Sequence, residues 1–257
     1  MGAHLSSGVL SHYRTILMMI SAFLVCATGN IINDILDIEA DRINHPQRVL
    51  VKKIISPTYA WKLAITLGSS SLIVIFFTDF VLLAIVAVSL VLLLLYNYIF
   101  KNIPLVGNVV LSLLASALLL SGAVSANPHN FYLFPGAFVA AVFAFFIHLI
   151  RELIKDVQDM EGDQRSGFQT LPIKIGVRYT TSLIVLLQII LTILSIFPLV
   201  LGWYGIYYHI IAVYLVNLPL LIIAVIVQLK TEPKQLKLAS QTYKAGMVLG
   251  LIALFLG

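Results

Sequence analysis

Charge is scarce in this chain. Only 11% of its 257 residues are charged and 60% are hydrophobic, whereas an average soluble domain has about 25% charged residues. This composition excludes an ordinary soluble globular protein and predicts an all-α, polytopic membrane protein. No stretch between the apolar runs is long enough for a separate soluble domain, so we expect residues 1–257 to form one integral-membrane domain.

Cysteine and basic clusters are also rare. The single cysteine, Cys26, lies inside an apolar run, which excludes an internal disulfide. The net charge is +5 without a basic tract, so nucleic acid is not an expected partner. Residues 1–11 lack the basic region that precedes the apolar core of a signal peptide.

Long apolar runs are abundant, and we expect eight spanning helices that form two halves of four. The last of them is short. Their expected ranges are Tyr13–Asn33, Tyr59–Phe77, Phe80–Phe100, Leu105–Ser125, Phe131–Ile150, Tyr179–Val200, Tyr204–Leu229 and Tyr243 to the end.

Basic residues predict the orientation of these spans. With alternating spans, 15 of the 16 Lys and Arg residues fall on one side and only Arg14 falls on the other. The positive-inside rule places the basic side in the cytoplasm of a cell membrane.

Acidic residues are rarer still, and nine of the 11 fall within two short segments, 34–41 and 152–163. In each segment three aspartates are spaced i, i+3, i+7, which puts them on one face of a helix. These are Asp34, Asp37 and Asp41 in the first segment, and Asp156, Asp159 and Asp163 in the second. Both segments follow spans that end on the basic side, so both rows of carboxylates should open to the same compartment.

Rows of like charge repel one another, so a cation is expected between them. Carboxylate oxygens favour Mg²⁺, which usually binds through few carboxylates together with substrate phosphates. The alternative without a functional role is two solvated acidic loop faces, but ionisable groups at membrane spans are usually functional. The pattern therefore predicts a metal–diphosphate site.

The acidic segments resemble the two aspartate-rich motifs of the UbiA superfamily of intramembrane prenyltransferases. The resemblance rests on Asn33-Asp34-x-x-Asp37-x-x-x-Asp41-Arg42-x-Asn44-x-Pro46, on Asp156-x-x-Asp159-x-x-Gly162-Asp163, and on Tyr96 and Lys101 between them. The family's Arg-Pro-x-Pro-Ser-Gly loop reads here Arg48-Val49-Leu50-Val51-Lys52-Lys53. The family has nine spans, so the resemblance also implies that this chain lacks the first of them.

The resemblance implies a helical bundle around a central cavity, in which Mg²⁺ bridges the aspartates to an isoprenoid diphosphate. An allyl carbocation would then be attacked by a lipophilic acceptor. Implied metal ligands are Asn33, Asp34, Asp37, Asp41, Asp156, Asp159 and Asp163. Implied catalytic residues are Asp37, Asp41, Asp159, Asp163 and Lys101. Implied substrate contacts are Asn33, Arg42, Arg48, Tyr96, Lys155 and, as an alternative to Tyr96, Tyr98.

The acceptor is the open part of this interpretation. The residues of the two motifs are most similar to those of one branch of the family. That branch joins geranylgeranyl diphosphate to geranylgeranylglyceryl phosphate through an ether bond, in ether-lipid synthesis. Branches that prenylate 4-hydroxybenzoate, homogentisate or chlorophyllide are the alternatives. A membrane transporter that uses buried carboxylates is an alternative of another class. The sequence leaves the oligomeric state open.

Overall fold

The computed structural model describes residues 1–5, 12–128 and 135–257, and every regular element within these ranges is helical. The long helices are α2 (His12–Leu36), α4 (Pro57–Phe76), α5 (Phe80–Tyr98), α6 (Val106–Ala126), α7 (Gly136–Arg165), α9 (Val177–Val200), α11 (Leu218–Leu229) and α12 (Pro233–Leu256). The short elements are α1 (Gly2–Leu5), α3 (Ile38–Asn44), the 3₁₀ turn η1 (Phe100–Asn102), α8 (Leu171–Ile175), α10 (Ile206–His209) and the π-helical turns η2 (Ile210–Asn217).

Eight helical segments in the described part of the chain are long and apolar enough to cross a membrane. The elements α10, η2 and α11 join into one of them, Ile206–Leu229. The expected all-α fold with eight spans is therefore confirmed for these residues.

Most predicted boundaries lie within a few residues of the structure, and two differ by more. The last helix begins at Pro233 and has 24 residues, so the prediction of a short span starting at Tyr243 was wrong. Lys234 and Lys237 make its first turns polar, but both side chains are exposed and leave the helix intact. The fifth helix continues past the predicted end at Ile150 to Arg165, while its predicted start at Phe131 lies outside the described residues.

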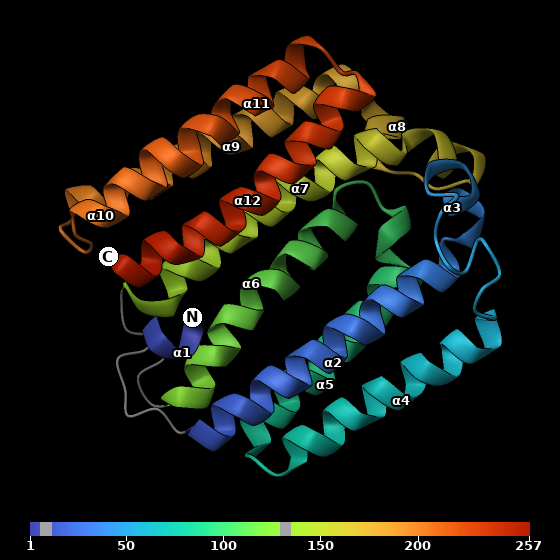
Figure 1. Cartoon of the computed structure of the whole chain (residues 1–257), viewed down its shortest axis with the longest axis horizontal. Helices are drawn as coiled ribbons and strands as arrows, with labels where there is room; N and C mark the ends of the chain where they lie inside the picture. Colours follow the sequence, from blue (N-terminus) through green and yellow to red (C-terminus); the bar gives the residue numbers. More distant parts are fainter. Residues whose placement is uncertain (6–11, 129–134) are drawn as a thin grey trace.

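The spans form two groups that follow the two halves of the sequence (Figure 1). Helices α2, α4, α5 and α6 make one group, α7, α9, α11 and α12 make the other, and α6 packs against α7 between them. Each group has its own apolar core. Outward-facing side chains such as Phe23, Phe80 and Leu229 are large, apolar and exposed, as a lipid-facing surface requires.

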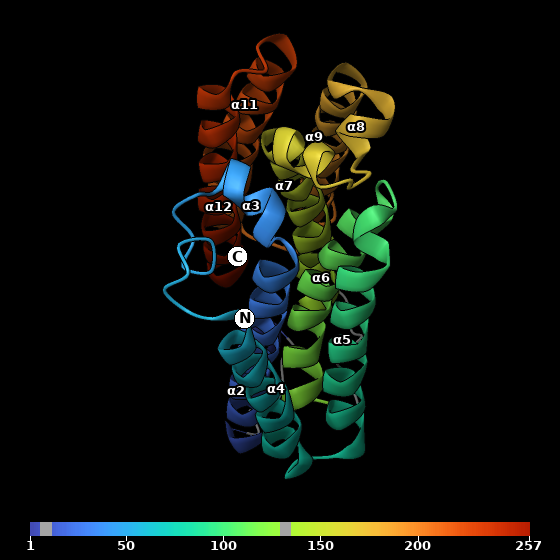
Figure 2. The same cartoon turned by 90° about the vertical axis from the view of Figure 1, so that its right-hand side faces the viewer.

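One end of the bundle collects the acidic segments. Helix α2 ends just before Asp37, and the chain turns into α3, which lies against α7 (Figure 2). The second acidic segment forms the last turns of α7. At the opposite end Arg14 forms an ion pair with Asp79, which also caps α5. Because α2 and α7 both end here, both acidic rows lie at the same end of the bundle.

Candidate active site

A polar cavity lies where α2, α3, η1, α6 and α7 meet, and we call it the acid pocket. It contains six of the seven predicted metal ligands and four further predicted site residues. The ligands are Asn33, Asp37, Asp41, Asp156, Asp159 and Asp163, and the further residues are Arg48, Tyr96, Lys101 and Lys155.

Three predicted site residues do not line this pocket. Asp34 lies outside the lining of the pocket and pairs with Arg48 at 2.7 Å. Arg42 is exposed and pairs with Glu39 on its own helix. The side chain of Tyr98 is 56% exposed, whereas Tyr96 lies on the pocket wall. Of the two candidate tyrosines, Tyr96 is thus the one in position to contact a substrate.

Cationic side chains sit on the first acidic row. Lys101 forms an ion pair with Asp37, whose other oxygen accepts a hydrogen bond from Asn33 at 2.8 Å. Arg48 pairs with Asp41 at 2.5 Å. Burial raises the pKa of the Asp41 carboxyl above its ordinary value, although the Arg48 guanidinium lowers it in part. This row therefore has its own counter-ions.

The second row lies on one continuous helix, as the spacing predicts. Asp156 accepts a hydrogen bond from Asn108 of α6 at 2.9 Å, and Asp159 pairs with His45 at 3.2 Å. Asp163 is buried. Neither Asn108 nor His45 is among the site residues expected from the sequence. The Gly107-Asn108 pair, typical of the family, was the available signal for Asn108.

Asn44 joins the two rows. Its amide nitrogen donates to the Asp159 carbonyl at 2.8 Å, and its amide oxygen accepts from the Gly162 N–H at 3.1 Å. A Cβ atom on Gly162 would lie 2.6 Å from the Ala40 carbonyl oxygen and would also strike Asn44. Only glycine at this position lets α3 approach α7 so closely.

The acid pocket adjoins a large, mostly apolar cavity between α2, α5, α6 and α7. The two spaces share Asn33, Tyr96, Glu152 and Lys155 as lining residues. The apolar cavity has a volume of about 460 Å³. Its apolar lining includes Met18, Val25, Val86, Leu93, Leu111 and Leu114. A polar head group and a long hydrocarbon tail can therefore be bound end to end.

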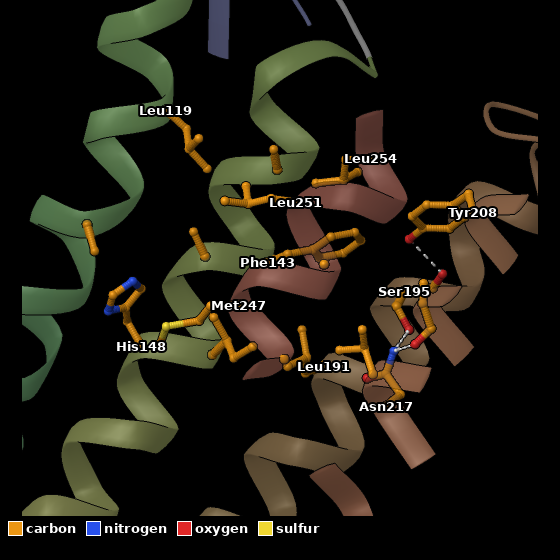
Figure 3. Close-up of a pocket in the computed structure, with 18 of the residues that line it drawn as sticks. Leu119, Phe143, His148, Leu191, Ser195, Tyr208, Asn217, Met247, Leu251 and Leu254 are labelled. Carbon is orange, nitrogen blue, oxygen red and sulfur yellow. Dashed lines mark hydrogen bonds between the residues drawn. The ribbon is translucent and has the colours of Figure 1, made fainter. Parts of the chain in front are cut away.

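A second apolar cavity lies on the far side of α6 and α7, toward α9 and α12 (Figure 3). It meets the first at Ala115, Leu118 and His148. Its wall near α9 and η2 has polar side chains that hydrogen-bond to one another: Asn217 donates to the Ser195 hydroxyl at 2.8 Å. It does not reach the aspartates.

The acidic rows fit Mg²⁺ that is shared with a substrate. Among the described residues, no three His, Cys, Asp or Glu side chains converge closely enough to hold one metal by themselves. Instead, carboxylates face each other across the acid pocket. This suits Mg²⁺, which typically takes one or two carboxylates and fills its other positions with phosphate oxygens and water.

Opposed carboxylate rows beside an apolar cavity, within a membrane-spanning helical bundle, fit an intramembrane prenyltransferase. The sequence pattern of the UbiA prenyltransferase family matches residues 1–252. The chain belongs to this family, and the transporter alternative is therefore set aside.

Comparison with named proteins shows which members of the family this chain is similar to. The chain is 35% identical over 206 residues to digeranylgeranylglyceryl phosphate synthase of Thermococcus kodakarensis, covering 79% of this chain and 72% of that protein. It is also similar to a solved structure described as digeranylgeranylglyceryl phosphate synthase, with 29% identity and a TM-score of 0.71 over 98% of this chain and 88% of the other. A UbiA homologue from Archaeoglobus fulgidus, bound to DMAPP and Mg²⁺, has the same fold with 16% identity and a TM-score of 0.63; the match covers 100% of this chain and 93% of that one.

Proposed function

We propose that this enzyme transfers a geranylgeranyl group from its diphosphate to geranylgeranylglyceryl phosphate, in ether-lipid synthesis. The observation that carries the proposal is the junction of the acid pocket with the large apolar cavity. The acceptor is inferred from the relatives, because several that align with most of this chain are named digeranylgeranylglyceryl phosphate synthases.

In this reaction the bond between the allylic carbon and the diphosphate oxygen breaks, and diphosphate leaves with the electron pair. The acceptor hydroxyl oxygen then forms the ether bond and loses its proton to the departed diphosphate. Lys101 and Arg48 already lie on the first-row aspartates, where they can stabilise charge on the leaving diphosphate. The apolar lining keeps water away from the allyl cation.

We further propose that Mg²⁺ is held by Asn33, Asp37 and Asp41 on one side and by Asp156, Asp159 and Asp163 on the other. When bound, Mg²⁺ would supply Lewis-acid stabilisation of the diphosphate oxygens. Support comes from the hard oxygen ligands that these residues place in one pocket, and from the homologue bound to DMAPP and Mg²⁺.

A product assay tests this function. Purified protein receives Mg²⁺, geranylgeranyl diphosphate and geranylgeranylglyceryl phosphate, and mass spectrometry identifies the lipids. We expect the doubly prenylated glycerol phosphate, and none with EDTA. Parallel reactions contain 4-hydroxybenzoate, homogentisate or chlorophyllide. A prenylated product in one of these alone would replace the proposed acceptor, and product formation in EDTA would contradict the metal assignment.

A further inference from the structure

One charged cluster at the site is not explained by the acidic rows. Arg151, Glu152 and Lys155 lie on neighbouring turns of α7, and we call them the Arg151 cluster. One Glu152 oxygen pairs with Arg151 at 3.0 Å and the other with Lys155 at 2.9 Å. A single carboxylate thus fixes the spacing of two cations.

The Arg151 cluster has an excess of one positive charge, because two cations share one carboxylate. Glu152 is buried, and the Arg151 side chain is only 17% exposed. The Nε atom of Arg151 is buried and has no hydrogen-bond partner in the structure. A buried cation with an unused donor is costly unless an anion accepts from it. The cluster is therefore complementary to an anionic group.

The cluster lies where the acid pocket and the apolar cavity meet, since Glu152 lines both spaces. Lys155 lines both the acid pocket and the apolar cavity, whereas Arg151 lines the apolar cavity alone. Arg151 precedes Lys155 by one helical turn, on the side away from Asp159 and Asp163. An anion bound by both cations would lie at the head of the apolar cavity, one turn from the aspartates.

We propose that Arg151 and Lys155 bind the phosphate monoester of the lipid acceptor, separately from the metal-bound diphosphate of the donor. This inference rests on the proposed function. Arginine offers a planar fork of donors that matches phosphate, and lysine adds a point charge. A phosphate monoester carries one to two negative charges, and the first of them matches the excess of one positive charge on the Arg151 cluster. The site would select acceptors that have a phosphate over those that have a free hydroxyl.

The test compares Arg151→Gln and Lys155→Gln with wild type, using geranylgeranylglyceryl phosphate and its dephosphorylated form as acceptors. We expect the KM for the phosphorylated acceptor to rise about 10- to 100-fold in each variant, as for a lost hydrogen bond to a charged group. The KM for geranylgeranyl diphosphate should change far less. The preference for the phosphorylated acceptor should fall by the same factor, and Arg151→Lys should restore it only in part.

Arg165→Gln is the matched control, since Arg165 lies on the same helix and pairs with Glu161 on the exposed surface. Its acceptor preference should equal that of wild type. If the Gln variants keep the phosphate preference, or if their donor KM rises instead, the assignment of the Arg151 cluster is overturned while the proposed function stands. If wild type makes no ether from either acceptor, the proposed function is overturned, and this assignment with it.

Discussion

Lys53 has a left-handed backbone conformation, with φ of 57°. It ends the loop that begins at Arg48, at the position where the family's loop has glycine. A residue with a Cβ atom is strained in this conformation, whereas glycine is not. Lys53 therefore stores strain in the segment that carries Arg48 to Asp41.

Relief of this strain gives a prediction. Lys53→Gly should raise the free energy of unfolding by about 0.5–1 kcal/mol, because the strain removed exceeds the added freedom of the unfolded chain. Thermal unfolding in detergent measures the change. Lys52→Gly is the control, since Lys52 has no positive φ and glycine there should destabilise. Equal effects of the two substitutions would contradict this explanation.

The carboxylates facing each other across the acid pocket give a second prediction. Asp37→Asn and Asp159→Asn keep the side-chain shape but remove a charged ligand, so kcat should fall by at least about 100-fold in each. Steady-state assays with purified protein measure this. Glu161→Gln, on the exposed side of the same α7 turns, should retain wild-type turnover. Full activity in either Asp variant would refute the metal–diphosphate assignment.

At the scale of elements, the contact between α3 and α7 sets the distance between the two acidic rows. It consists of the Asn44 side chain, which bonds to two backbone groups of α7, and of Gly162, which leaves room for it. Because α3 is a helix of only seven residues, its position depends on such contacts rather than on its own stability.

Gly162→Ala should therefore push α3 away from α7. We expect a fall in kcat of about 10-fold or more, since small misplacements of reacting groups cost about that much or more. The Mg²⁺ concentration needed for half-maximal rate should rise as well, while helical content by circular dichroism stays the same. Gly250→Ala is the control, because a Cβ atom on that helical glycine meets open space. Normal Mg²⁺ dependence in Gly162→Ala would show that the α3–α7 contact does not set the site.

At the scale of the whole molecule, the sequence predicted what depends on local composition. Eight apolar runs give eight spans, and the regular spacing of Asp156, Asp159 and Asp163 gives one helical face. The start of α12 was predicted too late in the chain, because Lys234 and Lys237 lower the apolar content of its first turns, which are still helical. The contacts of Asn44, His45 and Asn108 could not be predicted, because they join elements far apart in the chain and follow no periodicity.

Orientation in the membrane is a prediction for the whole chain. We propose that the acid pocket faces the cytoplasm, because 15 of the 16 basic residues are expected on that side. Cys26 is the single cysteine, so Cys26→Ala gives a background for single-cysteine labelling. In intact cells a membrane-impermeant maleimide should label Leu201→Cys but not Lys52→Cys, and both after lysis. The reverse pattern would place the pocket outside.

The ion pairs of Lys101 with Asp37 and of Arg48 with Asp41 affect how metal and substrate bind. A free Mg²⁺ ion must compete with a tethered cation for each of these carboxylates, and a free diphosphate must draw each cation away from its carboxylate. A Mg²⁺–diphosphate complex would meet both demands at once: Asp37 and Asp41 would hold the metal, and Lys101 and Arg48 would contact the phosphates. Substrate binding would then be an ion exchange, in which each charged side chain trades one partner of opposite charge for another. Metal and diphosphate should accordingly bind with strong positive cooperativity, each of them weakly when it arrives alone.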